Sequence, residues 1–246
     1  MGSPAYPPLR AVIFDLDGTL VDSAPDLAFA ANRMLAALGM PGRDSALLAT
    51  FIGKGIPRLV ERSLAGSLDG AADAALMARA LPLYERFYEE ESGRRTSVYP
   101  GVAEGLEMLV REDLPLACVT NKAARFAHAL LADKGLAHFF SVVVGGDTLP
   151  RKKPDPLPFR HVCERLGVAA REALVVGDSR NDVAGARAAG CPVICVPYGY
   201  NEGEPVAALH SDAIVATLVE AARIVIASRS ALSEVLCAVL SAKARA

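Results

Sequence analysis

Short apolar runs alternate with helical patterns over most of the chain. Five of these runs have the length and apolar character of buried parallel strands, and they cover residues 11–16, 116–120, 141–144, 173–176 and 192–196. Helical patterns lie before or between the later runs, over residues 102–112, 123–134, 158–166 and 182–189. Strands and helices that alternate at this spacing predict an α/β fold with a parallel sheet that is covered on both faces.

Residues 17–115 break this alternation, because they hold several helical patterns and no clear strand. Ser23 is a candidate N-cap, and the helix that follows it ends at Gly39. Two more helical patterns cover residues 56–64 and 76–87. An insertion at this point overhangs the carboxyl edge of the sheet, where open α/β sheets bind ligands. We expect a small helical domain that acts as a lid, with a fixed helical decoration as the alternative.

These patterns divide the chain into three parts. The core would comprise residues 9–21 and 98–227, the cap residues 22–97, and a C-terminal amphipathic helix residues 228–246. The apolar stripe of this last helix is formed by Leu232, Val235, Leu236, Val239 and Leu240. Such a stripe either packs on its own domain or pairs with a second subunit, and we expect it to pack on its own domain. The protein is accordingly expected to be a monomer or a homodimer.

Composition and charge exclude several classes of partner. The 246 residues are 52% hydrophobic and 22% charged, and the formal net charge is -2, so there is no basic surplus for nucleic acid or anionic membranes. No apolar run reaches the ~20 residues that a membrane-spanning helix needs. The five cysteines are scattered and odd in number, which argues against a disulfide framework. We expect a cytoplasmic protein that binds neither nucleic acid nor membrane.

Two carboxylates stand where the first predicted strand ends. Asp15 and Asp17 are separated by one residue, and Gly18 follows at once. Burying two carboxylates side by side is costly unless something neutralises them. Mg²⁺ is commonly held by one or two carboxylates, with water and substrate phosphate as its other ligands. The pattern predicts a Mg²⁺ site, although Mn²⁺ accepts the same ligands; the alternative is a strand end with both carboxylates in water.

Further polar motifs follow the other predicted strands. The carboxyl ends of parallel strands meet at one edge of a sheet, so these motifs are expected to lie close to the two aspartates. They are Thr120-Asn121-Lys122 after the second strand, Lys152-Lys153-Pro154-Asp155-Pro156 in the loop after the third, and Gly177-Asp178-Ser179-Arg180-Asn181-Asp182 after the fourth. Their order and spacing carry more weight than any one motif.

The complete set suits phosphoryl transfer. We expect Asp15 to attack phosphorus and form an aspartyl-phosphate. Asp17 would give a proton to the leaving oxygen and later take one from water. Thr120 and the backbone N–H of Asn121 would hydrogen-bond the phosphoryl oxygens, and Lys153 would neutralise the clustered charge.

The remaining charged residues of these motifs complete the expected site. Asp178 would complete the metal site. Asp182, four residues later, would hold a metal-bound water or pair with Lys153. Lys152 competes with Lys153 for the place beside the phosphoryl group, and only the following Pro-Asp-Pro favours Lys153.

In this order the motifs resemble those of the haloacid dehalogenase superfamily of phosphohydrolases. The resemblance rests on the D-L-D-G-T-L at 15–20, the T-N-K at 120–122, the K-P-D-P at 153–156 and the G-D-S-x-N-D at 177–182. It implies a Rossmann-like parallel sheet core with an inserted α-helical cap domain, and a metal held by Asp15, the backbone carbonyl of Asp17 and Asp178. Because dehalogenases lack an acid/base Asp at the place of Asp17, it also implies a phosphatase or phosphomutase.

Within the superfamily the chain is similar to the phosphoglycolate phosphatases. This similarity rests on Phe51-Ile52-Gly53-Lys54-Gly55, Asp147-Thr148-Leu149-Pro150 and Pro197-Tyr198-Gly199-Tyr200-Asn201. It implies that Gly53 and Gly55 let the cap backbone approach a small substrate, and that Lys54 contacts the substrate carboxylate when the cap closes. The alternative for Lys54 is a solvated loop lysine.

The resemblance makes 2-phosphoglycolate, a small phosphorylated acid, the leading substrate candidate for a Mg²⁺-dependent phosphatase. A sugar phosphatase or a phosphomutase of the same superfamily is the second hypothesis. A phospho-receiver or binding module also places an acidic metal site on a doubly wound sheet. In such a module, however, neither Asp17 as a proton donor nor the inserted cap would have a purpose.

Overall fold

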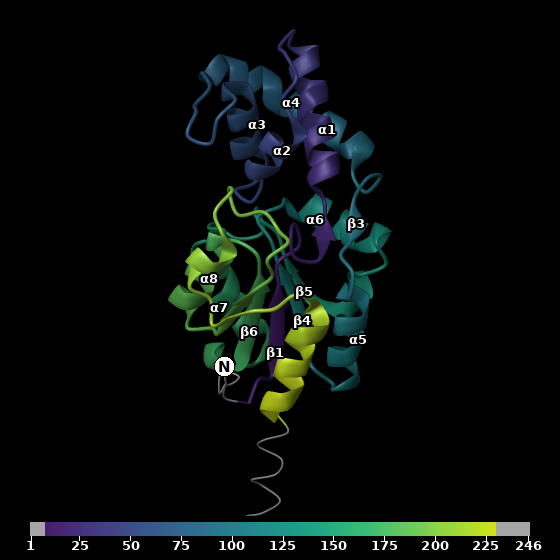
Figure 1. The fold of residues 1–246 in the computed structure, drawn as a ribbon, viewed down its shortest axis with the longest axis vertical. Coiled ribbons are helices and arrows are strands. Elements are labelled where there is room, and N and C mark those ends of the chain that lie inside the picture. The colour runs from purple at the N-terminus through teal and green to yellow at the C-terminus, as the bar shows by residue number, and fades with distance from the viewer. Residues whose placement is uncertain (1–7, 230–246) are drawn as a thin grey trace, which may run out of the picture.

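The computed structural model describes residues 8–229 of the chain. A layered core of sheet and helices carries a smaller group of helices at one end (Figure 1). The core sheet has six parallel strands in the order β5-β4-β1-β6-β7-β8. Their bounds are Ala11–Phe14 (β1), Leu116–Val119 (β4), Phe140–Val144 (β5), Ala173–Gly177 (β6), Val193–Cys195 (β7) and Ala213–Ile214 (β8).

Helices bury both faces of this sheet. Along β1, Val12 and Phe14 face one side and Ala11 and Ile13 the other, which is the alternation that a strand imposes. The first side is covered by α5 (Val102–Arg111), α6 (Ala124–Asp133) and a helix over residues 218–229, and the second by α7 (Leu157–Leu166) and α8 (Arg180–Ala189). Short 3₁₀ turns lie at Ala137–Phe139 (η1), Ala170–Glu172 (η2) and Val206–Leu209 (η3). The predicted Rossmann-like core is confirmed.

The helical insertion has a hydrophobic core of its own. It consists of α1 (Ala24–Ala37), α2 (Ser45–Thr50), α3 (Ile56–Ala65) and α4 (Ala74–Glu91). α1 packs along α4, and buried side chains such as Met34, Phe51 and Tyr84 fill the space between the helices. This cluster is separate from the two that flank the sheet, so the expectation of an inserted helical cap is confirmed. α2 is an addition to the three helices that the sequence predicts.

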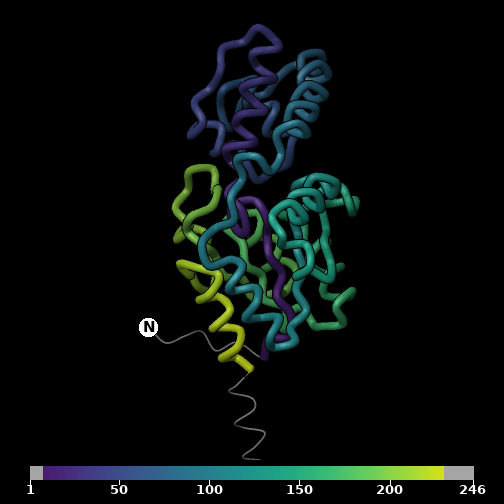
Figure 2. The backbone as a smooth tube through the Cα atoms, turned by 90° about the vertical axis from the view of Figure 1, so that its right-hand side faces the viewer, coloured from purple at the N-terminus to yellow at the C-terminus, as the bar shows by residue number. Residues whose placement is uncertain are grey.

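Two short strands join the cap to the core. β2 (Val21–Asp22) and β3 (Ser97–Val98) pair antiparallel, with Val21 opposite Val98. The two crossings between the domains therefore lie side by side, beyond the carboxyl end of β1 (Figures 1 and 2). Neither strand is predicted from the sequence, because two residues are too few to show a period.

The last described helix, residues 218–229, packs on the core and buries Leu218, Ala222 and Val225. The apolar stripe predicted for the C-terminal helix begins after this segment and lies outside the described residues. None of the helices within residues 8–229 has the length and apolar character that a bilayer crossing requires.

Candidate active site

The turn after β1 places Asp15 at the carboxyl edge of the sheet. Its backbone N–H donates to Val176 O of β6 at 3.0 Å, so the sheet continues to this residue. Gly18 then reverses the chain with a φ of 89°, a conformation that glycine adopts at little cost. A Cβ atom at Gly18 would lie 2.4 Å from Asp178 Oδ2. Both the backbone conformation and the packing against Asp178 therefore require glycine here.

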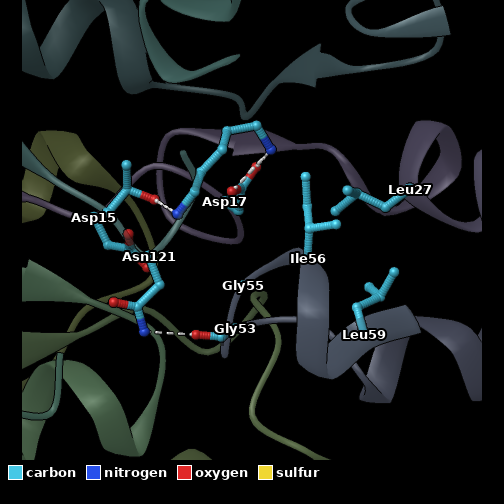
Figure 3. Close-up of a pocket in the computed structure, with 10 residues that line it drawn as sticks. Asp15, Asp17, Leu27, Gly53, Gly55, Ile56, Leu59 and Asn121 are labelled. Carbon is cyan, nitrogen blue, oxygen red and sulfur yellow. Dashed lines mark hydrogen bonds and ion pairs between the residues drawn. The ribbon is translucent and has the colours of Figure 1, made fainter. Parts of the chain in front are cut away.

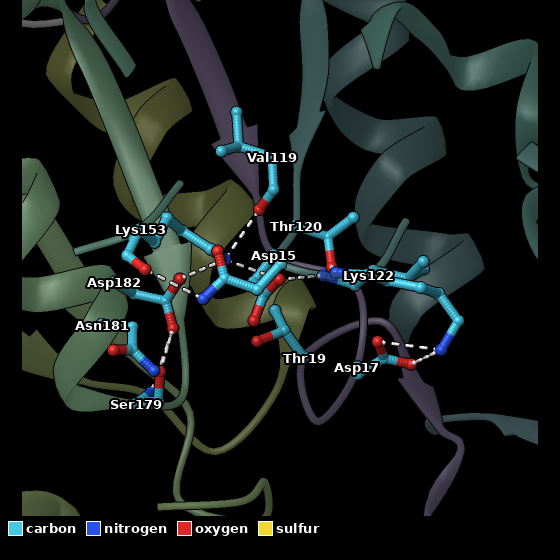
Figure 4. Close-up of polar contacts among 12 residues, drawn as sticks. Asp15, Asp17, Thr19, Val119, Thr120, Lys122, Lys153, Ser179, Asn181 and Asp182 are labelled. Atoms are coloured by element: carbon cyan, nitrogen blue, oxygen red, sulfur yellow. Dashed lines mark hydrogen bonds and ion pairs between the residues drawn. The ribbon is translucent and has the colours of Figure 1, made fainter. Parts of the chain in front are cut away.

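Lys153 joins two of the predicted aspartates. Its Nζ lies 2.7 Å from Asp15 Oδ1 and 2.7 Å from Asp182 Oδ1, and it donates to Val119 O at 2.7 Å (Figure 4). These three partners match the three N–H groups of the ammonium. Burial alone would lower the pKa of Lys153, but the two carboxylates raise it above its ordinary value. Lys153 therefore stays charged beside Asp15.

The competing lysine, Lys152, faces another part of the molecule. Its Nζ donates to the backbone carbonyl of Lys54 at 2.8 Å, and burial lowers the pKa of Lys152. Of the two neighbours, Lys153 is the one that reaches the aspartates.

The β6–α8 turn supplies Asp178 and Asp182. Asp178 Oδ1 accepts a hydrogen bond from Thr19 Oγ1 at 2.8 Å, and its Oδ2 accepts from the backbone N–H of Tyr200 at 2.6 Å. Asp182 Oδ2 accepts from the hydroxyl and the backbone N–H of Ser179, while its Oδ1 accepts from Lys153 Nζ. Asp182 is thus seen in one of its two expected arrangements, the ion pair with the lysine.

Asp17 is turned toward a different cation. Its Oδ1 and Oδ2 lie 2.8 and 3.1 Å from Lys122 Nζ (Figure 4), and Oδ1 also accepts from the Ser23 hydroxyl. Ser23 stands at the N-cap position of α1 but makes no side-chain cap bond, so its hydroxyl serves Asp17 instead of the helix. Neither Lys122 nor Ser23 is assigned a site role from the sequence; the only signal for Lys122 is its place in the T-N-K motif.

Thr120 and Asn121 follow β4 at the same edge of the sheet, and both are buried. Thr120 Oγ1 accepts from the backbone N–H of Lys122 at 3.2 Å, which leaves its own hydrogen to donate. Asn121 Nδ2 donates to Gly53 O at 2.9 Å and to Lys153 O at 3.0 Å. The side-chain nitrogen of Asn121 therefore ties the cap to the core.

The cap loop between α2 and α3 lies directly on the core. Gly53 O accepts a second hydrogen bond, at 3.3 Å, from Asn181 Nδ2. Gly53 and Gly55 have φ of 111° and 85°, where other residues are disfavoured. Lys54 leaves the loop in another direction, because its Nζ pairs with Glu202 Oε1 at 2.6 Å and the side chain is 41% exposed. The structure thus brings Gly53 to the site and pairs Lys54 with Glu202.

Glu202, in the loop after β7, connects the core to two cap cations. Its Oε1 also lies 2.8 Å from Arg62 Nη2, on a guanidinium that is almost fully buried. Burial alone would raise the pKa of Glu202, but Lys54 and Arg62 lower it below its ordinary value. The cap is therefore docked on the core through charged as well as backbone contacts.

A small pocket remains between cap and core. Its volume is about 40 Å³, which is room for a few water molecules. The core side consists of Asp15, Asp17, Thr120, Asn121 and Lys122, and the cap side of Leu27, Gly53, Gly55, Ile56 and Leu59 (Figure 3). Apolar cap side chains thus face charged core side chains across the space next to Asp15.

The aspartates have the donor set of a divalent-metal site. Oxygen atoms of Asp15, Asp178 and Asp182 lie within 4.8 Å of one another. Burial raises the pKa of Asp15 to about 7, even though Lys153 acts to lower it, and burial also raises the pKa of Asp178. Burial disfavours the charged carboxylates, and a bound cation would offset that cost, so these clustered oxygens fit a metal ligand set.

The charge balance of the cluster leads to the same conclusion. Four carboxylates, those of Asp15, Asp17, Asp178 and Asp182, face two ammonium groups, those of Lys122 and Lys153. Two negative charges remain, and one divalent cation would balance them.

Comparisons with known proteins give the family. Residues 9–190 match the family model of the haloacid dehalogenase-like hydrolases. The phosphoglycolate phosphatase of Nitrosospira multiformis is 53% identical over 218 residues, which are 89% of this chain and 96% of that protein. The phosphoglycolate phosphatase of Thiobacillus denitrificans is 50% identical with the same coverage. A crystal structure of a predicted phosphoglycolate phosphatase from Haemophilus somnus has a TM-score of 0.83 at 34% identity and covers 88% of this chain and 97% of that one.

The fold, the site and these relatives define a capped α/β enzyme that hydrolyses phosphoric monoesters, as expected from the motifs. More specifically, the chain belongs to the haloacid dehalogenase-like hydrolase family. The resemblance carried by the D-x-D, T-N-K, K-P-D-P and G-D-S-x-N-D motifs is therefore confirmed.

Proposed function

We propose that this enzyme is a Mg²⁺-dependent phosphatase that converts 2-phosphoglycolate and water to glycolate and phosphate. The observation that carries the proposal is one small pocket under the cap into which both Asp15 and Asp17 project, with Lys153 bonded to Asp15. The relatives named phosphoglycolate phosphatase support the choice of substrate.

Asp15 is the nucleophile of the proposed reaction, and Asp17 is the general acid and base. A carboxylate oxygen of Asp15 attacks phosphorus, and the bond between phosphorus and the glycolate oxygen breaks. Asp17 gives a proton to that departing oxygen. Water then attacks the phosphorus of the aspartyl-phosphate, Asp17 takes a proton from this water, and the bond from Asp15 to phosphorus breaks to release phosphate.

Three groups beside Asp15 stabilise the transferring phosphoryl group. Lys153 supplies a buried positive charge, Thr120 a hydroxyl hydrogen and Asn121 its backbone N–H. Preorganised charges and donors of this kind stabilise the charge that develops on the phosphoryl oxygens, and loss of one hydrogen-bond donor typically costs about 10²- to 10³-fold in rate.

Asp15, the backbone carbonyl of Asp17 and Asp178 would hold Mg²⁺, and Asp182 would keep Lys153 in place behind them. Bound Mg²⁺ neutralises charge on the phosphoryl oxygens. The all-oxygen donor set and the two unbalanced negative charges support a hard divalent ion.

The cap, residues 22–97, is the proposed lid over a core formed by residues 9–21 and 98–227. The hydrogen bonds at Gly53 and the ion pairs at Glu202 support a closed arrangement. Closure of such a lid excludes water other than the one that reacts, and the small pocket under the cap supports a small substrate over a bulky one.

The test is phosphate release in the presence of Mg²⁺ from 2-phosphoglycolate, hexose phosphates, pyridoxal phosphate, nucleotides and pyrophosphate. A kcat/KM for 2-phosphoglycolate at least about tenfold above the others is the expected result. A profile led by a hexose phosphate would replace the proposal by a sugar phosphatase, and conversion to an isomeric hexose phosphate would indicate a mutase. The Asp15→Asn variant sets the background, and turnover by that variant would contradict the mechanism.

A further inference from the structure

The acid group of a small phosphorylated acid needs a cation inside the pocket, and among the described residues that line it only Lys122 carries a positive charge. Lys153 has its three N–H groups bound to Asp15, Asp182 and Val119 O. Lys54, the lysine expected from the sequence to meet the acid group, pairs instead with Glu202. The structure therefore offers a different lysine for this task.

Lys122 lines the pocket beside Asp17. Its side chain is only 3% exposed, and its ammonium donates to both carboxylate oxygens of Asp17. The ammonium also lies 5.0 Å from the ring centroid of Tyr88, on cap helix α4. An ammonium has three N–H groups, and the partner of Lys122 besides Asp17 is the neutral hydroxyl of Tyr88. A second anion is a stronger acceptor than a neutral hydroxyl and can take this donor.

The chemistry of the substrate places its acid group near this donor. In 2-phosphoglycolate one CH₂ group separates the bridging oxygen from the carboxylate carbon. Asp17, the proposed proton donor to the bridging oxygen, lies 2.8 Å from Lys122 Nζ. Because Lys122 holds Asp17, it is also within reach of the substrate carboxylate, whose carbon is two bonds from the bridging oxygen.

We propose that Lys122 is the specificity-determining residue that binds the carboxylate of the substrate, through a charge-assisted hydrogen bond made while it still holds Asp17. This inference rests on the proposed function and names the residue that selects an acid over a neutral ester. Leu27, Ile56 and Leu59 close the opposite side with apolar groups, so a carboxylate left on that side would be buried without a partner.

The first test compares two substrates that differ only in the acid group. Kinetics of the wild type and of Lys122→Met are measured with 2-phosphoglycolate and with ethyl phosphate, which has a methyl group in place of the carboxylate. Loss of a hydrogen bond to a charged group should lower the acid-to-neutral ratio of kcat/KM by about 10- to 100-fold in Lys122→Met. A lysine that only positions Asp17 would slow both esters equally, and an unchanged ratio would overturn the inference.

Lys54→Met is the matched control, because it removes the rival lysine by the same substitution. The acid-to-neutral ratio should stay at the wild-type value in this variant. A ratio that falls in Lys54→Met and not in Lys122→Met would overturn the inference in favour of the cap lysine. A wild type that does not favour the acid ester would overturn the proposed function as well, so the two failures are distinguishable.

A binding measurement covers the case in which Lys122→Met turns over too slowly to assay. Circular dichroism first establishes that the variant is folded. Titration calorimetry then gives Kd values with Mg²⁺ for 3-phosphonopropionate, in which CH₂ replaces the bridging oxygen, and for propylphosphonate, which lacks the acid. Selective weakening of the first ligand by about 10-fold or more supports the inference, and equal weakening of both ligands contradicts it.

Discussion

Gly53 O of the cap and Asn121 Nδ2 of the core are 2.9 Å apart, in a hydrogen bond that crosses the domain boundary. Asn121 directly follows Thr120, and the same Nδ2 also donates to the backbone carbonyl of Lys153. The side chain of Asn121 thus connects the cap to the segment that would hold the phosphoryl group. Opening of the proposed lid would break this hydrogen bond, so the position of the cap and the order of the proposed phosphate site would change together.

Lys153→Met should both destabilise the protein and remove most of its activity. The substitution leaves the buried carboxylates of Asp15 and Asp182 without their cation, which costs about 3–5 kcal/mol in comparable buried pairs. Urea denaturation and kcat measure the two effects. Lys152→Met is the matched control and should cost about 1 kcal/mol or less, since the hydrogen bond of its Nζ within residues 8–229 is to Lys54 O. Equal losses in the two variants would contradict the role of Lys153.

Removal of divalent metal should abolish turnover and lower the melting temperature. Without a cation, the carboxylates of Asp15 and Asp178 face each other with two charges of the cluster unbalanced. Added Mg²⁺ should restore both properties, and at 100 times its Kd it should stabilise the fold by about 2.7 kcal/mol. The Asp178→Asn variant should lose most of this thermal shift. Full activity after exhaustive chelation would show that the site works without a metal.

The contact between Glu202 and the cap should weaken in acid. Because the pKa of Glu202 is lower in the folded protein than its ordinary value, its contribution to stability is complete above that ordinary value, about 4.5. The contribution is lost as the pH falls through the lower, folded-state pKa. Since the carboxylate is about one third exposed, we expect it to amount to roughly 1 kcal/mol or less. Stability curves of the wild type and Glu202→Gln between neutral pH and pH 3 should converge at the acid end.

Glu202→Gln should also raise KM by favouring the open cap, since Lys54 and Arg62 lose their shared partner. Glu204→Gln is the matched control, because Glu204 lies in the same loop and pairs with Arg180 of the core. Steady-state kinetics with 2-phosphoglycolate should show the rise only in the first variant. A similar KM in both variants would mean that the Glu202 contact does not govern closure.

Two glycines with left-handed backbone allow a test of the turn after β1. Gly18 and Gly39 have φ of 89° and 71°, so the backbone conformation alone should make alanine at either position cost about 1–2 kcal/mol. Only at Gly18 would the new Cβ meet the carboxylate of Asp178, whereas nothing lies within 4 Å at Gly39. Gly18→Ala should therefore raise the Mg²⁺ concentration for half-maximal activity, and Gly39→Ala should not. The same Mg²⁺ dependence in both variants would argue against this link between the turn and the metal.

The main elements of the fold follow from local pattern. Each predicted strand of the sheet is a run of apolar residues long enough to stand out, and the cap helices α1, α3 and α4 each show an apolar stripe. β2, β3 and β8 have two residues each. Two residues are too few to show the alternation of apolar and polar positions by which a strand is predicted, so these strands could not be predicted from the sequence. α2 has six residues and a single buried side chain, Leu48, so its amphipathic pattern is equally short.

The convergence of the aspartates with Lys153 could also be predicted, because strand ends of a parallel sheet meet at one edge. The partners of individual side chains could not. Lys152 and Lys153 are adjacent in sequence and differ only in the direction that the folded loop gives them. The pairing of Lys54 with Glu202 depends on two loops far apart in the chain, and no periodicity encodes how such loops meet.

The antiparallel pair of β2 and β3 has a consequence for how such an enzyme can change over generations. Both ends of the helical insert leave the core at adjacent points, with Val21 beside Val98 and Asp22 beside Ser97. The insert can therefore be lengthened, shortened or exchanged without moving any strand of the sheet. This architecture is modular: the helical insert can vary above the same sheet, and a poorly packed insert need not unfold the core.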